Sequence, residues 1–178
     1  WEEMEKVVDD LAAYRVPSLL LSGGEPLVHP RFFDLVQRAS AVGLKLTIST
    51  NGTLITPEKA ALLKAAGVAY VGISLDGIGR IHDEFRRKEG AFDAAVRGFR
   101  NCHEVGQKTG LRLTLTRHNV ENIGQILDFI EEQEIQRVCF YHLVPAGRGS
   151  SLQVLTAEES PHAIDTLISR AERWQGQG

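Results

Sequence analysis

Hydrophobic and polar positions follow two periods that alternate along the chain. Short apolar runs, typical of buried strands, are separated by stretches in which apolar residues recur every three or four positions, as on amphipathic helices. The runs predict strands at 16–22, 44–50, 68–75, 111–116 and 137–143. The helical spacing predicts helices at 4–14, 32–39, 57–66, 92–105, 120–133 and 157–174.

Strict alternation of strands and helices with short connections predicts an α/β fold of parallel strands joined by right-handed crossovers. A barrel and an open sheet both fit this pattern. The connection 76–91 is expected to be a long loop rich in charge and glycine. A helix precedes the first strand, so we expect one strand and its loop to be missing from residues 1–178.

Composition favours an ordinary globular domain. The chain has 178 residues, 43% of them hydrophobic and 24% charged, with a net charge of -3. Basic residues are scattered among acidic ones, which argues against nucleic acid as a partner. No apolar run approaches the ~20 residues of a membrane helix, and no signal-peptide pattern opens the chain, so a cytoplasmic location is expected.

Polar motifs follow each predicted strand, whereas the opposite strand ends carry nothing comparable. The motifs are SGGEP (22–26), STNGT (49–53), SLDG (74–77), TLTRHN (114–119) and HLVPAGRG (142–149). Ligands of parallel α/β folds bind at the carboxyl ends of the strands. The five endings therefore predict one shared binding site.

The GGEP turn has the properties of a site for a bound ammonium group. Gly23 and Gly24 allow a sharp turn and a close approach of the backbone to a ligand, and Pro26 favours an extended Glu25. We expect the Glu25 carboxylate and the last strand carbonyls to be acceptors without donors. A plain strand-to-helix turn is the alternative reading.

Two further strand endings carry paired polar groups. Asn51-Gly52 fits a hairpin turn, but a helix is predicted directly after it. Ser49 and Asn51 share one face of their strand, as do Ser74 and Asp76. These hydroxyl, amide and carboxylate groups suit ribose hydroxyls and the polar end of a small ligand, although a solvated loop explains either pair alone.

The later endings offer weaker signals. Polar residues alternate with leucines over 111–116. This pattern predicts either a strand with one face on helices and the other lining a solvated interior, or an edge strand exposed to solvent. His142 is either a satisfied structural residue or a catalyst. The arginines at 86, 87 and 148 can each bind a carboxylate, although most arginines are simply solvated.

Taken in order, GGEP, STNGT and ISLDG closely resemble the radical S-adenosylmethionine (SAM) enzymes in their partial (βα)6 TIM-like barrel form. The resemblance covers nearly the whole chain, so residues 1–178 are expected to form a truncated core barrel. The stretches LSGGEPLVHPRFFDL, GISLDGIGRIHDEFRRKEGAFDAAVRGF, LRLTLTRHNVENI and FYHLVPAGRG look most like the NirJ-like group of haem d1 and alternative haem biosynthesis.

The resemblance implies a set of SAM-binding residues. They are Gly23, Gly24, Glu25 and Pro26 for the amino group; Ser49, Asn51, Ser74 and Asp76 for the ribose and carboxylate; Arg86 or Arg87 for that carboxylate; and Thr116 with the backbone near Leu143 and Val144 for the adenine. If the substrate is a carboxylated tetrapyrrole, the expected propionate contacts are Arg112, His142 and Arg148.

The resemblance also implies a [4Fe–4S] cluster, held by a CxxxCxxC motif upstream of residue 1. Cys102 and Cys139 stand far apart and cannot replace three neighbouring thiolates, so no metal site is expected within the chain and the fragment alone should be inactive. The intact enzyme, an oxidoreductase, would take an electron from a donor such as flavodoxin or ferredoxin. It would then cleave SAM to a 5′-deoxyadenosyl radical that abstracts hydrogen.

Two other functions remain open at this point. The first is a radical SAM peptide maturase or another cofactor-biosynthesis enzyme, because these branches share much of the same motif text. The second is a non-catalytic nucleotide-binding α/β module. The chain has neither a GxGxxG nor a GxxxxGK phosphate loop, which argues against the second.

Overall fold

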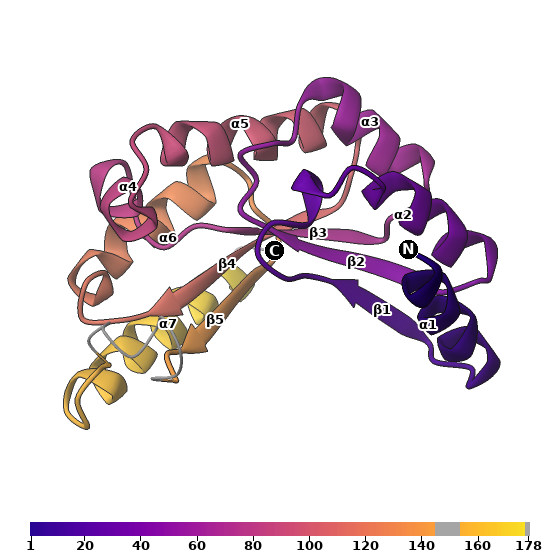
Figure 1. The fold of residues 1–178 in the computed structure, drawn as a ribbon. Helices are drawn as coiled ribbons and strands as arrows, with labels where there is room; N and C mark the ends of the chain where they lie inside the picture. The colour runs from indigo at the N-terminus through magenta and orange to yellow at the C-terminus, as the bar shows by residue number, and fades with distance from the viewer. Residues whose placement is uncertain (145–153, 177–178) are drawn as a thin grey trace. The chain divides into compact units, whose positions relative to one another are not determined.

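The computed structural model describes residues 1–144 and 154–176 (Figure 1). The strands are β1 (Ser18–Leu21), β2 (Lys45–Thr50), β3 (Tyr70–Ser74), β4 (Thr109–Leu115) and β5 (Val138–His142). The α-helices are α1 (Glu2–Ala13), α2 (Phe32–Ala41), α3 (Pro57–Ala65), α4 (Arg80–Arg86), α5 (Ala91–Glu104), α6 (Ile123–Glu132) and α7 (Glu159–Gln175), with short 3-10 helices η1 (Pro26–Val28) and η2 (Val120–Asn122). Every predicted strand and helix is present.

The strands are hydrogen-bonded in the order in which they occur along the chain. β1 pairs with β2 and β2 pairs with β3, both in parallel, with Leu21 opposite Ile48 and Thr50 opposite Ile73. Parallel pairing requires a crossover between strands and excludes a hairpin at Asn51-Gly52. The sheet order confirms the predicted strand-helix alternation.

The chain divides into two compact units. The first comprises residues 1–74 and 93–111, and the second comprises residues 75–92 and 112–178. In the first unit, α2, α3 and α5 lie on the same side of β1, β2 and β3 (Figure 1). The core of this unit is formed by alternate strand residues and the inner faces of these helices, which include Val36, Leu46, Ile48, Leu63, Val71 and Ile73.

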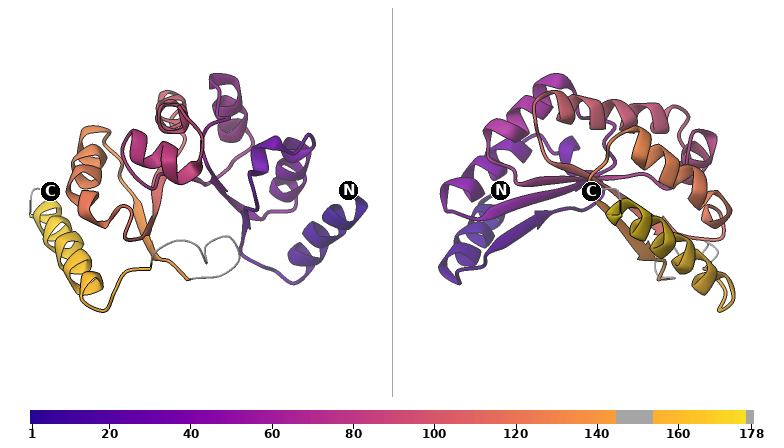
Figure 2. Two further views of the ribbon diagram at one scale, coloured as in Figure 1. Left: turned by 60° about the vertical axis from the view of Figure 1, so that its left-hand side comes forward. Right: turned by 180° about the vertical axis from the view of Figure 1, so that it is seen from behind.

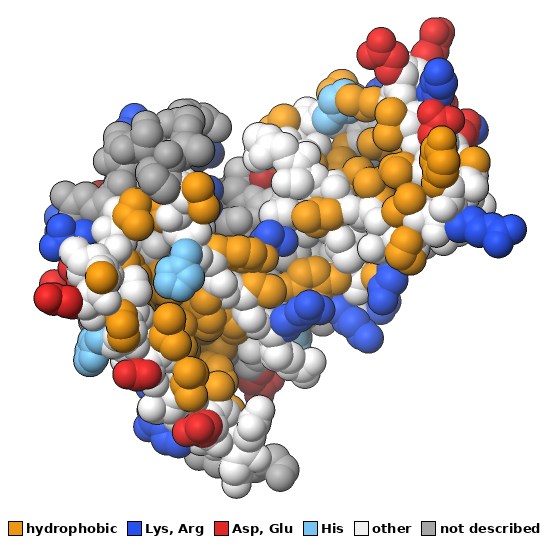
Figure 3. Space-filling model, turned by 90° about the horizontal axis from the view of Figure 1, so that it is seen from below, with side chains coloured by type: hydrophobic (Ala, Val, Ile, Leu, Met, Phe, Trp, Pro, Cys, Tyr) orange, Lys and Arg blue, Asp and Glu red, His pale blue; other side chains and the backbone are white. Residues whose placement is uncertain are grey.

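Strand β1 is not buried, contrary to the prediction from its apolar run. Its residues alternate between exposed and half-buried, and Leu20 is 47% exposed. β1 has one neighbour, β2, within the described residues, so one of its edges is unpaired there. Figure 3 shows hydrophobic side chains reaching the surface on the face seen from below.

The second unit has its own core. Leu113 and Leu115 of β4 are buried, as are Ile126 and Leu127 of α6. The leucines therefore lie on the covered face of β4, while Arg112 and Thr114, which alternate with them, are only half-buried, as the alternation predicts. Helix α7 lies beside α6 (Figure 2), where Arg170 pairs with Asp128 at 2.8 Å and with Glu131 at 3.0 Å.

Helix α4 occupies the connection that was predicted to be a loop. It has seven residues, too few to show a clear apolar period, and its buried residue is a histidine, His82. Positive φ angles at Gly79 (55°) and Arg87 (53°) bound the helix at its two ends. The polar appearance of 76–91 therefore concealed a short helix, which carries one of the candidate arginines.

Candidate functional site

The turn after β1 leaves two glycines uncovered. Gly23 and Gly24 are exposed, and a Cβ atom added to either would meet, beyond its chain neighbours, no atom of the described residues within 4 Å. Gly23 has φ of 141°, a conformation that residues with side chains rarely adopt. Gly24 is exposed and has free space at its Cβ position, so this side of its backbone is open to the approach of another molecule.

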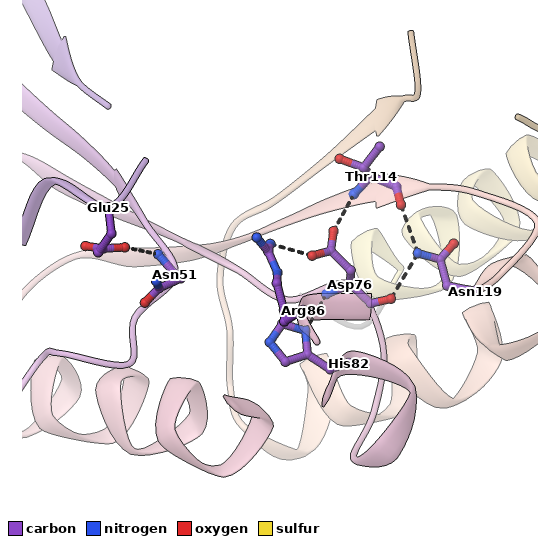
Figure 4. A network of polar contacts seen from close by, with 7 residues as sticks. All are labelled: Glu25, Asn51, Asp76, His82, Arg86, Thr114 and Asn119. Atoms are coloured by element: carbon purple, nitrogen blue, oxygen red, sulfur yellow. Dashed lines mark hydrogen bonds and ion pairs between the residues drawn. The ribbon is translucent and has the colours of Figure 1, made fainter. Parts of the chain in front are cut away.

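The carboxylate of Glu25 accepts hydrogen bonds from groups of the chain itself. Its Oε1 accepts the Leu27 N–H at 3.1 Å and the Thr50 hydroxyl at 2.7 Å. Its Oε2 accepts the Asn51 N–H at 2.7 Å (Figure 4). The expectation of a carboxylate without donors is therefore wrong. A carboxylate has about four lone-pair sites, so one site of Oε2 is not filled by any of the described residues.

Asn51 directly follows strand β2. Its Oδ1 accepts hydrogen bonds from the backbone N–H of Thr53 at 2.9 Å and from the Thr53 hydroxyl at 2.8 Å. This side-chain turn carries the chain towards α3. The side-chain oxygen of Asn51 is thus occupied by the chain. The hydroxyls of Ser49 and Ser74, by contrast, have no hydrogen-bond partner in the described part of the chain.

The loop after Asn51 is packed closely against α5. Gly52 has φ of 77°, and a Cβ atom at Gly52 would come within 2.6 Å of the Ile73 side chain. A Cβ atom at Gly98 of α5 would lie 2.4 Å from the carbonyl oxygen of Gly52. Both positions therefore require glycine for steric reasons.

Asp76, in the second unit, is buried and paired. Its side chain is 3% exposed, and its Oδ2 lies 2.5 Å from Nη2 of Arg86. Its Oδ1 accepts the Thr114 N–H at 3.3 Å (Figure 4). Asp76 is therefore closed to a ligand, and its ion pair fixes the position of the Arg86 guanidinium, whose side chain is 33% exposed.

The structure distinguishes the two adjacent arginines. Arg86 forms the ion pair with Asp76, whereas Arg87 is exposed and ends α4 in a left-handed conformation. The backbone N–H of Arg87 donates to the carbonyls of Asp83 and Glu84. Arg86 is thus the arginine with a fixed orientation.

Burial and charge determine the protonation of the groups around Arg86. Burial raises the pKa of Asp76, and the charge of Arg86 opposes this effect. His82 is 1% exposed, and burial together with Arg86 lowers its pKa to about 4. Nδ1 of His82 accepts the Asp76 N–H at 3.0 Å, so the neutral ring carries its hydrogen on Nε2.

Asn119 is a structural residue that the sequence did not single out. It is fully buried, and its Nδ2 donates to the carbonyls of Asp76 at 3.0 Å and Thr114 at 2.8 Å (Figure 4). Its Oδ1 accepts the Thr116 N–H at 2.9 Å. An asparagine in a polar loop is typical of any turn, so the TLTRHN motif gave no specific signal for this role.

Thr116 lies beyond the end of β4 and is 0% exposed. Its hydroxyl oxygen accepts the His118 N–H at 3.3 Å. Thr116 therefore has no surface open to a nucleotide in this structure, although it was predicted to flank the adenine.

Arg112 and His142 are not brought together. The guanidinium carbon of Arg112 lies 4.9 Å from the ring centroid of Tyr141 in β5. Because side chains alternate along a strand, His142 points to the opposite face of β5 from Tyr141. The two predicted propionate contacts are thus on different faces of this part of the sheet.

The remaining predicted positions follow β5. Leu143 is half-buried and Val144 is 75% exposed. Arg148 lies outside the described residues, so its predicted contact is not placed.

The described residues do not fit the iron–sulfur cluster. Neither cysteine lies near two further thiolates, and no group of three metal-ligating side chains occurs in residues 1–144 and 154–176. Cys102 is buried in α5, which raises the pKa of its thiol to about 11 and keeps it protonated. SAM itself fits better, because the uncovered Gly23-Gly24 backbone and the remaining lone pair of Glu25 suit an ammonium group.

The chain belongs to the radical SAM superfamily. The family model described as Radical SAM superfamily matches residues 1–130. The strand order and the helix succession agree with the partial TIM-like barrel of this family. Within the residues that the structure describes, no helix is both long and apolar enough to cross a membrane.

Curated relatives of the chain include two synthases and a maturase, according to their names. The chain is 48% identical to Fe-coproporphyrin III synthase of Methanosarcina barkeri, over 99% of this chain and 45% of that protein. It is 38% identical to pre-heme d1 synthase of Dinoroseobacter shibae (99% and 44%) and 32% identical to mycofactocin maturase MftC of Mycobacterium tuberculosis (96% and 44%). The chain thus spans less than half the length of these relatives.

Solved structures share the fold. Native anSMEcpe with bound AdoMet aligns with a TM-score of 0.79 at 20% identity, over 94% of this chain and 50% of that one. Streptococcus suis SuiB bound to the precursor peptide SuiA aligns with a TM-score of 0.79 at 19% identity, over 96% and 40%. At this level of identity, the likeness establishes the fold alone.

Proposed function

We propose that this chain forms the SAM-binding core of a radical SAM enzyme of tetrapyrrole biosynthesis. One observation carries the proposal: the Gly23-Gly24 backbone is uncovered and lies beside a carboxylate that the chain fixes in place but leaves with one open lone pair. The relatives named for coproporphyrin and pre-haem d1 synthesis support the tetrapyrrole class. A flavodoxin or ferredoxin as electron donor and a cytoplasmic location belong to the same proposal.

The first unit is assigned to the amino group and nearby polar atoms of SAM. Gly23 and Gly24 would offer backbone acceptors to the ammonium, Glu25 would offer Oε2, and Pro26 would hold the turn in shape. The Ser49 and Ser74 hydroxyls and the Asn51 amide are assigned to the ribose and carboxylate. SAM supplies the 5′-deoxyadenosyl group from which this superfamily obtains its hydrogen-abstracting radical.

The second unit is assigned separately. Arg86 is proposed to bind a carboxylate, and Asp76 to orient it. The backbone near Leu143 and Val144 is proposed for the adenine. Thr116 would have to become exposed to take part in that contact.

Calorimetry on the whole enzyme that contains this chain tests the site. Gly24→Leu should abolish SAM binding, because it fills the open backbone surface, and Glu25→Ala should weaken SAM binding to a measurable extent, because it releases the turn. Gly124→Leu is the matched control, since Gly124 is an exposed glycine with no atoms near its Cβ position. Unchanged SAM affinity in Gly24→Leu would refute the site.

The substrate class is tested through Arg112. A guanidinium stacked on an aromatic ring is held in one orientation and can bind a carboxylate with two parallel hydrogen bonds. Arg112→Gln should weaken binding of a tetrapyrrole with free propionates and leave its tetra-ester unaffected. Equal loss for the acid and the ester would assign Arg112 a purely structural role.

A peptide maturase remains the second candidate, because the chain is 32% identical to mycofactocin maturase MftC. Turnover of a precursor peptide with no consumption of tetrapyrrole would favour it. A non-catalytic nucleotide-binding module is separated by the same calorimetry, since such a module should bind ATP at least as tightly as SAM.

A further inference from the structure

We propose that Thr50 is a positioning residue for SAM, and that Glu25 acts on the ligand chiefly by fixing the Gly23-Gly24 turn. The inference rests on the proposed function, namely that this turn binds SAM. Thr50 belongs to the STNGT motif, yet its neighbours Ser49 and Asn51 were the residues that the strand-end pattern favoured.

The hydroxyl of Thr50 links two loops. Thr50 is 3% exposed, and its Oγ1 accepts the Gly52 N–H at 3.0 Å while donating to Oε1 of Glu25 at 2.7 Å. A hydroxyl has a single hydrogen to donate. Because the Gly52 N–H occupies an acceptor site of Oγ1, the hydrogen is directed to Glu25.

The carboxylate is tied on both sides. Through Oε1 it caps η1 by accepting the Leu27 N–H, two residues ahead in its own turn. Through Oε1 and Oε2 it is tied to the end of β2, at the Thr50 hydroxyl and the Asn51 N–H. The turn that carries the two glycines is thereby fixed to the strand.

The number of lone pairs limits direct contact with the ligand. Both sites of Oε1 are filled by Leu27 and Thr50, and one site of Oε2 is filled by Asn51. An ammonium group has three N–H donors, so Glu25 can satisfy one of them. The other two donors need backbone carbonyls, and the direction of those carbonyls depends on the turn that Thr50 and Glu25 hold.

Substitutions at Thr50 in the whole enzyme test this role by SAM calorimetry. Thr50→Val removes the hydroxyl at nearly constant volume, and with it the hydrogen bonds to Glu25 and Gly52. SAM binding should weaken by about 10-fold, the size of effect expected when a buried hydrogen-bonding group loses its partner. Thr50→Ser should bind within about 2-fold of the parent, because the donor is retained. Thr50→Cys, with its weaker donor, should lie between the two and serves if Thr50→Val does not fold.

The control is another threonine of β2. Thr47 donates only a long hydrogen bond of 3.5 Å, to the carbonyl of Leu19. Thr47→Val should leave SAM affinity unchanged. Parent-like affinity in Thr50→Val, or in Thr50→Cys if Thr50→Val does not fold, would overturn the positioning role.

Kinetics and a double substitution separate positioning from general damage. In Thr50→Val the KM for SAM should rise while kcat at saturating SAM stays near the parent value. Glu25→Ala combined with Thr50→Val should bind SAM no more weakly than Glu25→Ala alone, because both remove the same link. Additive losses would show that Glu25 acts independently of Thr50 and would overturn the inference.

Failure of the two proposals can be told apart. If the parent enzyme does not bind SAM, the proposed function fails and this inference fails with it. If the parent binds SAM and Thr50→Val binds it equally well, the inference alone fails.

Discussion

Glu25 in the first unit and Asp76 in the second are carboxylates that follow strand ends, and the chain satisfies them in different ways. Glu25 is half-buried and receives two backbone N–H groups and one hydroxyl, all uncharged. Asp76 is almost fully buried and is paired with a guanidinium. Uncharged donors do not neutralise a carboxylate, so its negative charge can attract an outside cation. In the second site, the guanidinium neutralises Asp76, and the oriented Arg86 side chain is partly exposed to solvent.

The strongest test of this difference removes the guanidinium from the second site. Arg86→Met should lower the free energy of unfolding by about 3 kcal/mol, because it leaves the buried Asp76 charge without a counter-ion. Urea denaturation at pH 7 measures the change. Arg80→Met, on the same helix but in an exposed pair with Glu84, should cost less than about 0.5 kcal/mol. A loss under about 1 kcal/mol in Arg86→Met would mean that Asp76 does not depend on Arg86.

A second test uses pH. His82 has a folded pKa of about 4 against 6.5 in the unfolded chain, so its neutral ring supports folding at and above pH 6.5 and this support is lost as the pH falls from 6.5 to 4. The free energy of unfolding should fall by about 3 kcal/mol in total, because each unit of pKa difference corresponds to roughly 1.4 kcal/mol. His82→Asn keeps an acceptor near Nδ1 but does not titrate.

The difference in unfolding free energy between the parent and His82→Asn should therefore shrink by about that amount between pH 6.5 and 4, by the same linkage. Arg86, Asp83 and Asp76 surround His82, so their charges are present in both proteins. A difference that does not change with pH would contradict a buried neutral histidine.

The third test concerns the steric support of the first site. Gly98→Ala should lower the free energy of unfolding by about 2 kcal/mol, because the new Cβ atom would overlap the backbone carbonyl of Gly52. Thermal unfolding provides the measurement. Gly124→Ala on α6 is the control and should be neutral or stabilising by up to about 1 kcal/mol, since no atoms lie near its Cβ position. Equal behaviour of the two variants would show that α5 does not pack closely on Gly52.

The smallest expected effect is at Thr53. Thr53→Val removes the hydroxyl that donates to Oδ1 of Asn51 and leaves the Thr53 N–H in place. The free energy of unfolding should therefore fall by about 1 kcal/mol. Chemical denaturation of this variant should be compared with that of Thr166→Val, which loses an exposed hydroxyl bond on α7. A loss above about 2 kcal/mol would indicate that the Asn51 turn carries more of the stability of the first site than its uncharged contacts suggest.

The regular elements of the fold were predictable because their apolar residues are periodic and their ends carry glycine or proline. Strand β1 was predicted as buried because an apolar run does not reveal whether a strand has one neighbour or two. Helix α4 was missed because seven residues around a buried histidine have no apolar period. Periodicity therefore shows that a segment is regular, and the neighbours in space decide how deeply it is buried.

The candidate site was predictable in position but not in the use of its atoms. The sequence placed Glu25 and Asp76 at strand ends, yet only the structure shows which donors reach them. Arg86 and Arg87 are equivalent in sequence, and only the helix geometry directs one of them to Asp76. Thr50 was overlooked because a threonine inside a strand is typical of β-structure and gives no sign of a bridging hydroxyl.

The contact between Gly98 and Gly52 has a mechanical consequence for the first unit. The backbones of α5 and of the loop after β2 are in close contact at Gly98 and Gly52. A displacement of α5 towards the sheet would therefore displace Gly52, whose N–H is hydrogen-bonded to Oγ1 of Thr50. Strain applied at the outer surface of α5 would thus reach the end of β2, where the Thr50 hydroxyl is hydrogen-bonded to Glu25 of the glycine turn.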